Sequence, residues 1–109
     1  MSAVRGRFTV HTMPLPSPLA PGNGAALKVG KYGALRKATV QVIAAALSAD
    51  LRIEASDDGT TWVELAAFTA AGIAGPFGVH EQLRVRVNAY TSSTGLSVLV
   101  AGFDARVES

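Results

Sequence analysis

The sequence predicts an all-β fold, an antiparallel β-sandwich of jelly-roll type with about 7–8 strands and an extended proline-rich N-terminal arm. Residues 51–55 alternate apolar with polar side chains, as a strand with one buried face does. Asp58-Gly59 follows, a dipeptide that favours the tight turn of a β-hairpin, and residues 60–63 resume with β-branched and aromatic side chains. Turn-forming residues separate further short apolar stretches, and no segment clearly predicts a helix.

The first 24 residues predict a strand and then an arm. Residues 4–11 alternate in the manner of a strand. The stretch 13–24 contains four prolines, which remove backbone donors and favour extended geometry: Pro14, Pro16, Pro18 and Pro21. This stretch is either a surface loop or an arm that lies along a neighbouring molecule, with Leu15 and Leu19 as anchors. We therefore divide the chain into this N-terminal strand and arm (1–24) and a sandwich domain (25–109).

The segments that precede the hairpin are less regular. Residues 25–29 predict a short strand and 30–33 a turn. Residues 38–47 are ambiguous, because their β-branched half favours a strand and the alanines of 44–47 favour a helix. We predict a strand, since the β-branched residues come first, and we place the connection to the hairpin at 48–50.

After the hairpin, the second strand is expected to end near Phe68, followed by a glycine-rich loop over 70–78. Residues 82–90 alternate cleanly and predict a strand, and 91–95 predict a polar turn. The last strand, 96–103, carries apolar residues on both faces, which indicates a central or doubly covered strand.

Composition indicates one domain that spends its time packed against other molecules. The chain has 109 residues, of which 49% are hydrophobic and 17% charged. A surface with so little charge is typical of a subunit that contacts neighbours. The absence of cysteine excludes disulfides, thiolate metal sites and cysteine nucleophiles. No apolar run reaches 18 residues, so we expect no membrane partner.

The net charge of +2 hides a division along the chain: residues 1–37 carry a charge of +6 and residues 38–109 a charge of −4. Such a split indicates a partner, which would be nucleic acid, an acidic protein surface or the body of a second copy. The alternative is that six charges spread over 37 residues are ordinary solvation.

No group of residues predicts catalysis, a metal or a cofactor. His11 and His80 lie far apart without metal-ligand spacing, and a hairpin explains Asp57-Asp58-Gly59 without calcium. Glu54 and Glu64 are expected to face each other across the hairpin as solvated groups, because a small sandwich rarely has a glycosidase cleft. We therefore predict that the chain is not an enzyme and needs no cofactor.

Two further features of the sequence bear on binding. Arg52, Arg84 and Arg86 point outward, but no aromatic residues accompany them at the spacing of single-strand-binding sheets, so nucleic acid is not the expected partner. Trp62 is predicted to pack in the core between the sheets; the alternative is an exposed platform for a sugar ring.

The stretch 51–62, with Ser-Asp-Asp-Gly-Thr-Thr-Trp at its end, and the later Gln-Leu-Arg-Val-Arg-Val-Asn of 82–88 resemble discoidin-like and related jelly-roll sandwiches. The same pattern occurs in short structural proteins of tailed bacteriophages, and the chain looks most like these, in particular like head-decoration (cement) proteins. The resemblance covers roughly residues 38–103. It implies a symmetric oligomer bound on a capsid, with arms and loops bridging neighbouring shell subunits, and no catalytic residue.

The expected function is therefore that of a virion structural protein, made in the host cytoplasm, that decorates and stabilises a phage capsid. Its expected partners are the major capsid protein and other copies of itself, as a dimer or trimer. The alternatives are a carbohydrate-binding module using Trp62 and Tyr90, or a tail or connector component. The residues expected to contact partners are Arg5, Arg7, Leu15, Leu19, Lys28, Lys31, Ile73 and Phe77.

Overall fold

The computed structural model describes residues 3–28, 35–78 and 81–108, and within them it contains eight strands and no helix. This confirms the predicted all-β class. No helix in the described part of the chain is long and apolar enough to cross a membrane. The strands are β1 (Ala3–Thr12), β2 (Gly22–Asn23), β3 (Leu35–Ile43), β4 (Ala46–Ser56), β5 (Val63–Phe68), β6 (Gly72–Gly78), β7 (Gln82–Thr94) and β8 (Ser97–Glu108).

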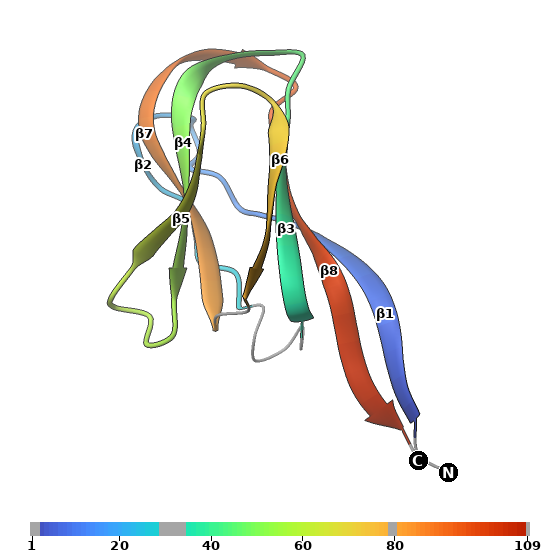
Figure 1. Cartoon of the computed structure of the whole chain (residues 1–109). Helices are drawn as coiled ribbons and strands as arrows, with labels where there is room; N and C mark the ends of the chain where they lie inside the picture. The colour runs from blue at the N-terminus through green and yellow to red at the C-terminus, as the bar shows by residue number, and fades with distance from the viewer. Residues whose placement is uncertain (1–2, 29–34, 79–80, 109) are drawn as a thin grey trace.

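The strands form two four-stranded antiparallel sheets that face each other (Figure 1). Sheet A has the order β1-β8-β3-β6 and sheet B the order β2-β7-β4-β5. The first strand pairs with the last, the second with the seventh, the third with the sixth and the fourth with the fifth. The chain is thus one long nested hairpin rolled into two sheets, which is the jelly-roll arrangement that the sequence predicted.

The core lies between the sheets because strand alternation points every second side chain inward. Sheet A supplies Val40, Val42, Val98 and Val100, and sheet B supplies Leu51, Ile53, Val85 and Val87. All eight are at most 1% exposed. Burying side chains of this kind stabilises the fold by about 1.5–3 kcal/mol each before the entropy of ordering is subtracted.

The stretch 13–24, predicted as an extended arm, crosses from sheet A to sheet B. It is extended and non-helical, as its prolines require. Met13, however, is 1% exposed and belongs to the core, its N–H donates to Val98 O at 2.8 Å, and Leu15 packs against the core. At the end of the stretch, Gly22 and Asn23 pair with β7 as strand β2. The stretch therefore connects the two sheets.

The glycine-rich residues predicted as a loop form the edge strand β6, which pairs with β3. The prediction was wrong over 72–78 because backbone hydrogen bonds hold this strand without any side-chain alternation. The connection predicted at 48–50 lies instead at 44–45, since β4 begins at Ala46. Its alternation is continuous from Leu47 onward and extends the strand backward.

Two further predictions differ in detail. A strand was predicted over 25–29, of which residues 25–28 are described. Among these four residues only Leu27 makes a β-bridge, to Leu83. The turn predicted at 30–33 lies outside the described residues. The hairpin β4–β5 is confirmed, but β5 begins at Val63, so residues 57–62 form a loop rather than a two-residue turn.

β1 and β8 extend beyond the rest of sheet A. The pairing of β8 with β3 ends at Asp104 and Leu35, whereas its pairing with β1 continues to Glu108 and Ala3. The end of this pair projects from the body as a two-stranded ribbon (Figure 1). The molecule measures 54 × 30 × 20 Å, and its radius of gyration of 14.5 Å exceeds the roughly 13 Å of a compact chain of this length.

The first prediction concerns Gly75 in the bulge where β6 shifts its register against β3. Its φ is +114°, and a Cβ there would lie 3.0 Å from Ala38 O and 3.2 Å from Thr39 Cα. Both neighbours are backbone atoms that cannot move aside. We expect Gly75→Ala to lower the free energy of unfolding by about 1–3 kcal/mol, as measured by urea denaturation.

Gly72→Ala is the matched control in the same strand, because a Cβ on Gly72 meets nothing within 4 Å. We expect it to change stability by less than about 0.5 kcal/mol. Equal losses in the two variants would show that the bulge conformation is not the cause.

Candidate functional site

The outer face of sheet A is set by the inward side chains of its two central strands. Because Val40 and Val42 point into the core, their neighbours on β3 point outward, and the same holds for the neighbours of Val98 and Val100 on β8. Adjacent β1 and β6 contribute residues in register with them. We call this surface face A: Val10, Thr12, Thr39, Gln41, Ile43, Ile73, Ser97, Leu99 and Ala101.

Face A is uncharged and partly apolar. The described chain has four exposed large hydrophobic side chains, and three of them lie on face A: Val10 at 52%, Ile43 at 41% and Ile73 at 68% exposed. The register aligns Thr12, Leu99, Gln41 and Ile73 in one row across all four strands. An uncharged surface that carries several large exposed side chains is typical of a contact surface rather than of a solvated sheet face.

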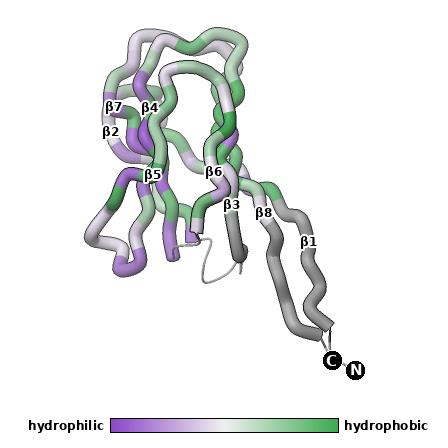
Figure 2. The backbone as a smooth tube through the Cα atoms, viewed as in Figure 1, coloured by the Kyte–Doolittle hydropathy of each residue, from purple (hydrophilic) through white to green (hydrophobic). Residues whose placement is uncertain are grey.

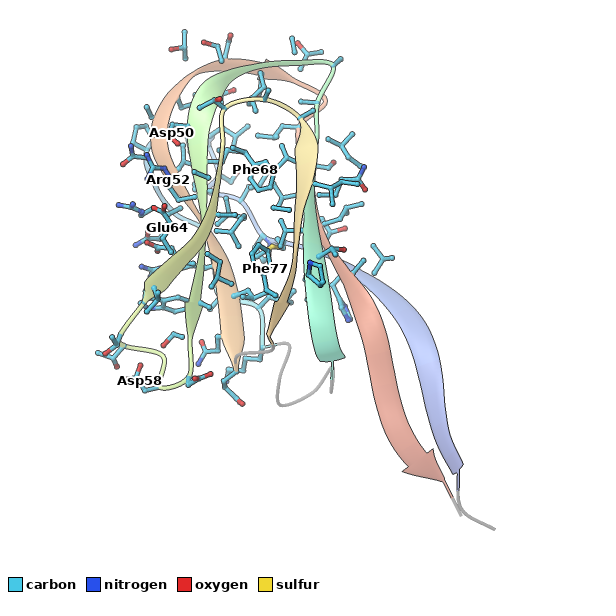
Figure 3. The ribbon with its side chains drawn as sticks, viewed as in Figure 1. Asp50, Arg52, Asp58, Glu64, Phe68 and Phe77 are labelled. Atoms are coloured by element: carbon cyan, nitrogen blue, oxygen red, sulfur yellow. The ribbon has the colours of Figure 1, made fainter. Side chains whose placement is uncertain are left out.

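The outer face of sheet B is charged, and hydrophilic residues recur along β4, β5 and β7 (Figure 2). We call this surface face B: Asp50, Arg52, Glu54, Glu64, Arg84, Arg86 and Asn88. Three carboxylates and three arginines balance one another. Arg52 donates to both carboxylate oxygens of Asp50 at 2.7 Å and to Glu64 Oε1 at 2.8 Å. Figure 3 shows Asp50, Arg52 and Glu64 together on this side of the sandwich.

Glu54 is the centre of face B. Its side chain is only 10% exposed, and it accepts a hydrogen bond from Arg84 Nε at 2.8 Å. Arg86 Nε lies 3.1 Å from the other carboxylate oxygen, but it is not aligned for a hydrogen bond, so that contact is ionic. The register places Glu54 opposite Glu64, as predicted. Each glutamate is paired with arginine, so the two do not form a free acid–base pair.

The hydrogen bonds between Asp50 and Arg52 hold both of these groups in their charged forms. The bidentate contact with Arg52, and then the hydrogen bond from Asn88 at 3.0 Å, lower the pKa of Asp50 to about 2. The same contact with Asp50 raises the pKa of Arg52. A carboxylate held ionised by two donors is a poor proton acceptor at neutral pH. Face B therefore has the properties of a closed structural network.

Trp62 lies at the end of this network and not in the core. It is half-buried, and the guanidinium of Arg84 stacks over its ring at 4.0 Å from the centroid. The predicted position between the sheets is therefore wrong. In the structure Trp62 lies in the loop before β5 and Arg84 at an outward position of β7, and the cation–π contact between them covers one face of the ring.

The Asp58 carboxylate organises the hairpin loop. It accepts hydrogen bonds from the backbone N–H groups of Thr61 at 2.7 Å and Thr60 at 2.8 Å, and the Ser56 hydroxyl donates to it at 2.9 Å. These contacts, led by Thr61, lower the pKa of Asp58. Gly59 has a φ of +79°, the conformation expected of the Asp-Gly turn. Within the described residues, no group of three or more His, Cys, Asp or Glu side chains could hold a metal ion.

The predicted contact residues are scattered. Ile73 lies on face A, whereas Leu15 and Phe77 pack against the core (Figure 3 shows Phe77 between the sheets). Leu19 is half-exposed and Lys28 is exposed.

The three other basic residues lie elsewhere. Arg5 and Arg7 lie on β1, opposite Arg106 and Asp104 in register. Lys31 lies outside the described residues. The role of these residues in partner contacts stays a prediction.

Val10, Ile43 and Leu99 were not predicted as contact residues. The sequence did contain a sign of this surface, because apolar residues on both faces of 96–103 indicated a strand covered on both sides. The outer side of β8 has no covering layer among the described residues.

Comparisons with known proteins give no match: no protein-family model, no curated protein and no solved structure is similar to this chain. The resemblance to phage structural proteins stays a prediction.

The second prediction tests the centre of face B. Glu54→Ala would leave Arg84 and Arg86 without their shared, nearly buried carboxylate, and we expect a loss of about 2 kcal/mol in the free energy of unfolding. Glu64→Ala removes a side chain that is 42% exposed and should cost less than about 1 kcal/mol. Urea denaturation measures both, and a larger loss for Glu64 would contradict the central role of Glu54.

The third prediction is an acid dependence. The pKa of Asp50 is about 2 in the fold and about 3.9 in an unfolded chain. Its contribution to stability is therefore present above about pH 4 and is lost as the pH falls toward 2. Asp50→Asn should be less stable than the parent at pH 7 and should lose less stability between pH 4 and pH 2. Glu81→Gln, outside face B, is the control for removing one carboxylate, and the same acid response in Asp50→Asn and the parent would refute the assignment.

Proposed function

We propose that this chain is a structural protein that binds a neighbouring protein surface through face A, and that it is not an enzyme. The observation that carries the proposal is the charge difference between the two outer faces. The charged side chains of face B form ion pairs with one another, whereas face A has no charged side chain and exposes Val10, Ile43 and Ile73. Covering face A therefore removes apolar area from water without removing any charge from water.

The size of face A indicates what such a contact needs. Four strands about 4.8 Å apart, paired over about 16 Å, cover on the order of 300 Å². A standard protein interface buries about 800 Å² on each partner. The projecting end of β1 and β8 continues sheet A and would extend the contact. The ribbon and face A together therefore suit a contact with a large, flat partner.

The setting that we propose is the capsid of a tailed bacteriophage, with the major capsid protein as partner and the virion surface as location. The resemblance of residues 51–62 and 82–88 supports it, and so does the use of jelly-roll sandwiches in viral capsids. A fold is shared by many functions, so this support is analogy. The carbohydrate-binding alternative gains nothing from Trp62, because Arg84 occupies one face of its ring.

The fourth prediction tests face A with one charge. Ile73→Glu should weaken binding at least tenfold, because the charge would have to be buried against an uncharged partner. Ile73 is 68% exposed on an edge strand, so the fold should tolerate the change. The measurement is co-sedimentation with shells assembled from the major capsid protein of a tailed bacteriophage.

Val63→Glu is the matched control, because Val63 is 60% exposed but lies on β5 of sheet B. We expect it to bind shells like the parent. Equal loss in both variants would refute a contact specific to face A. Parent protein that binds tail assemblies and not shells would assign the chain to the tail, and parent protein that binds neither would refute the proposal.

A further inference from the structure

The four edges of the two sheets are not equally protected against pairing with another strand. Natural edge strands are kept short, bulged or interrupted by proline, because an exposed regular edge pairs with other chains. β2 has two residues, and β5 has six with a register shift between Ile53 and Glu54 on its partner. β6 contains Pro76 and a bulge at Gly75. Three edges thus carry protection.

β1 is the unprotected edge. It has ten residues, contains no proline, and pairs with β8 in one unbroken register from Ala3 to Thr12. Its other side has no strand partner among the described residues. The row of backbone groups along that side is therefore available for pairing.

One hydrogen bond shows which residues of β1 point their backbone N–H and C=O groups away from β8. Met13 N–H donates to Val98 O at 2.8 Å, one step beyond the paired residues Thr12 and Leu99. In an antiparallel pair, successive residues point their N–H and C=O groups to opposite sides. The odd-numbered residues of β1 therefore bond to β8. The outward donors and acceptors belong to residues 4, 6, 8, 10 and 12.

We propose that β1 pairs antiparallel with β1 of a second copy, which joins the two A sheets into one eight-stranded sheet across a two-fold axis. A strand that presents both donors and acceptors is self-complementary under such an axis. The pairing also adds a third strand beside the projecting ribbon, and two-stranded ribbons are only marginally stable in water. This inference does not depend on what face A binds.

The arginines of β1 select the register. The outward backbone groups belong to even-numbered residues on both copies, so in every allowed register the numbers of two opposite residues add up to the same even number. The register in which this sum is 12 places Arg5 opposite Arg7 of the second copy, and the register in which it is 14 places Arg7 opposite Arg7; both are repulsive. The longest register without this repulsion is the one in which the sum is 16. It pairs residues 4–12, with Arg5 opposite His11 and Arg7 opposite Thr9 of the second copy.

The first experiment measures mass and amide exchange on the unmodified chain. Analytical ultracentrifugation over a concentration series should reach twice the 11.2 kDa mass of one chain. Amide exchange by NMR should show residues 4, 6, 8, 10 and 12 protected in the dimer and unprotected on dilution. A monomer at all concentrations would overturn the proposal, and so would a dimer in which these five amides exchange freely.

The second experiment removes one outward donor. Val10→Pro deletes an N–H that faces away from β8, and edge strands accept proline at such positions. We expect it to raise the dimer dissociation constant at least tenfold. Val10→Thr keeps the N–H while removing the apolar side chain, and it should change the constant less than threefold. Dissociation by both variants alike would assign the contact to face A and overturn the edge pairing.

Thr9→Pro is the control for the strand itself, because it deletes an N–H that faces β8. It should lower the stability of the monomer, whereas Val10→Pro should leave the monomer folded. If Val10→Pro also unfolds, the amide exchange of the unmodified chain decides the question. Shell binding is tested separately with Ile73→Glu, so each proposal can fail without the other.

Discussion

The pairing of the first strand with the last determines most of what this molecule presents to its surroundings. In a nested hairpin the outermost pair is formed by the two ends of the chain, and β1 and β8 are that pair. β8 is also paired with β3, so it lies inside sheet A while β1 is left at the edge. β8 continues beyond the last residue that it pairs with on β3. This end of β8 has only β1 beside it, and the two strands project from the body together with both termini (Figure 1). The open edge and the ribbon are thus two results of one topology.

The two outer faces show how strand alternation can prepare one side of a sandwich for water and the other for a partner. On sheet B the outward arginines and carboxylates pair between strands, Arg84 with Glu54 directly across the register and Arg52 with Glu64 diagonally. Such pairs already satisfy each other, so burying them against a partner would cost their remaining hydration with little gain. The residues that form face A on sheet A carry no charge. A contact there depends on shape and apolar area, not on matched ion pairs.

Sequence reasoning worked where one face of a strand is wet, and failed where side chains do not mark the strand. The alternation of Leu51 to Ala55 identified β4, because its outward residues are charged. β6 was missed because Gly72–Gly78 has no such contrast, although β3 supplies it with backbone partners. The role of Met13 was also hidden, since it begins the proline-rich stretch and its place in the core depends on where the chain crosses between the sheets. Face A was visible as apolar residues on both sides of β8, but a sequence cannot tell a covered face from one that awaits a partner.

Face A and the β1 edge point in different directions, and this matters for what one copy can do. Pairing along an edge extends a sheet in its own plane, whereas a contact with the outer face stacks a second layer about 10 Å above it. The two contacts use different groups, outward backbone atoms of β1 on one hand and side chains such as Ile43 and Ile73 on the other. Neither blocks the other, and two copies joined at β1 would present two uncharged faces side by side. Such a pair could hold two neighbouring subunits of a larger surface at once, which a single contact could not do.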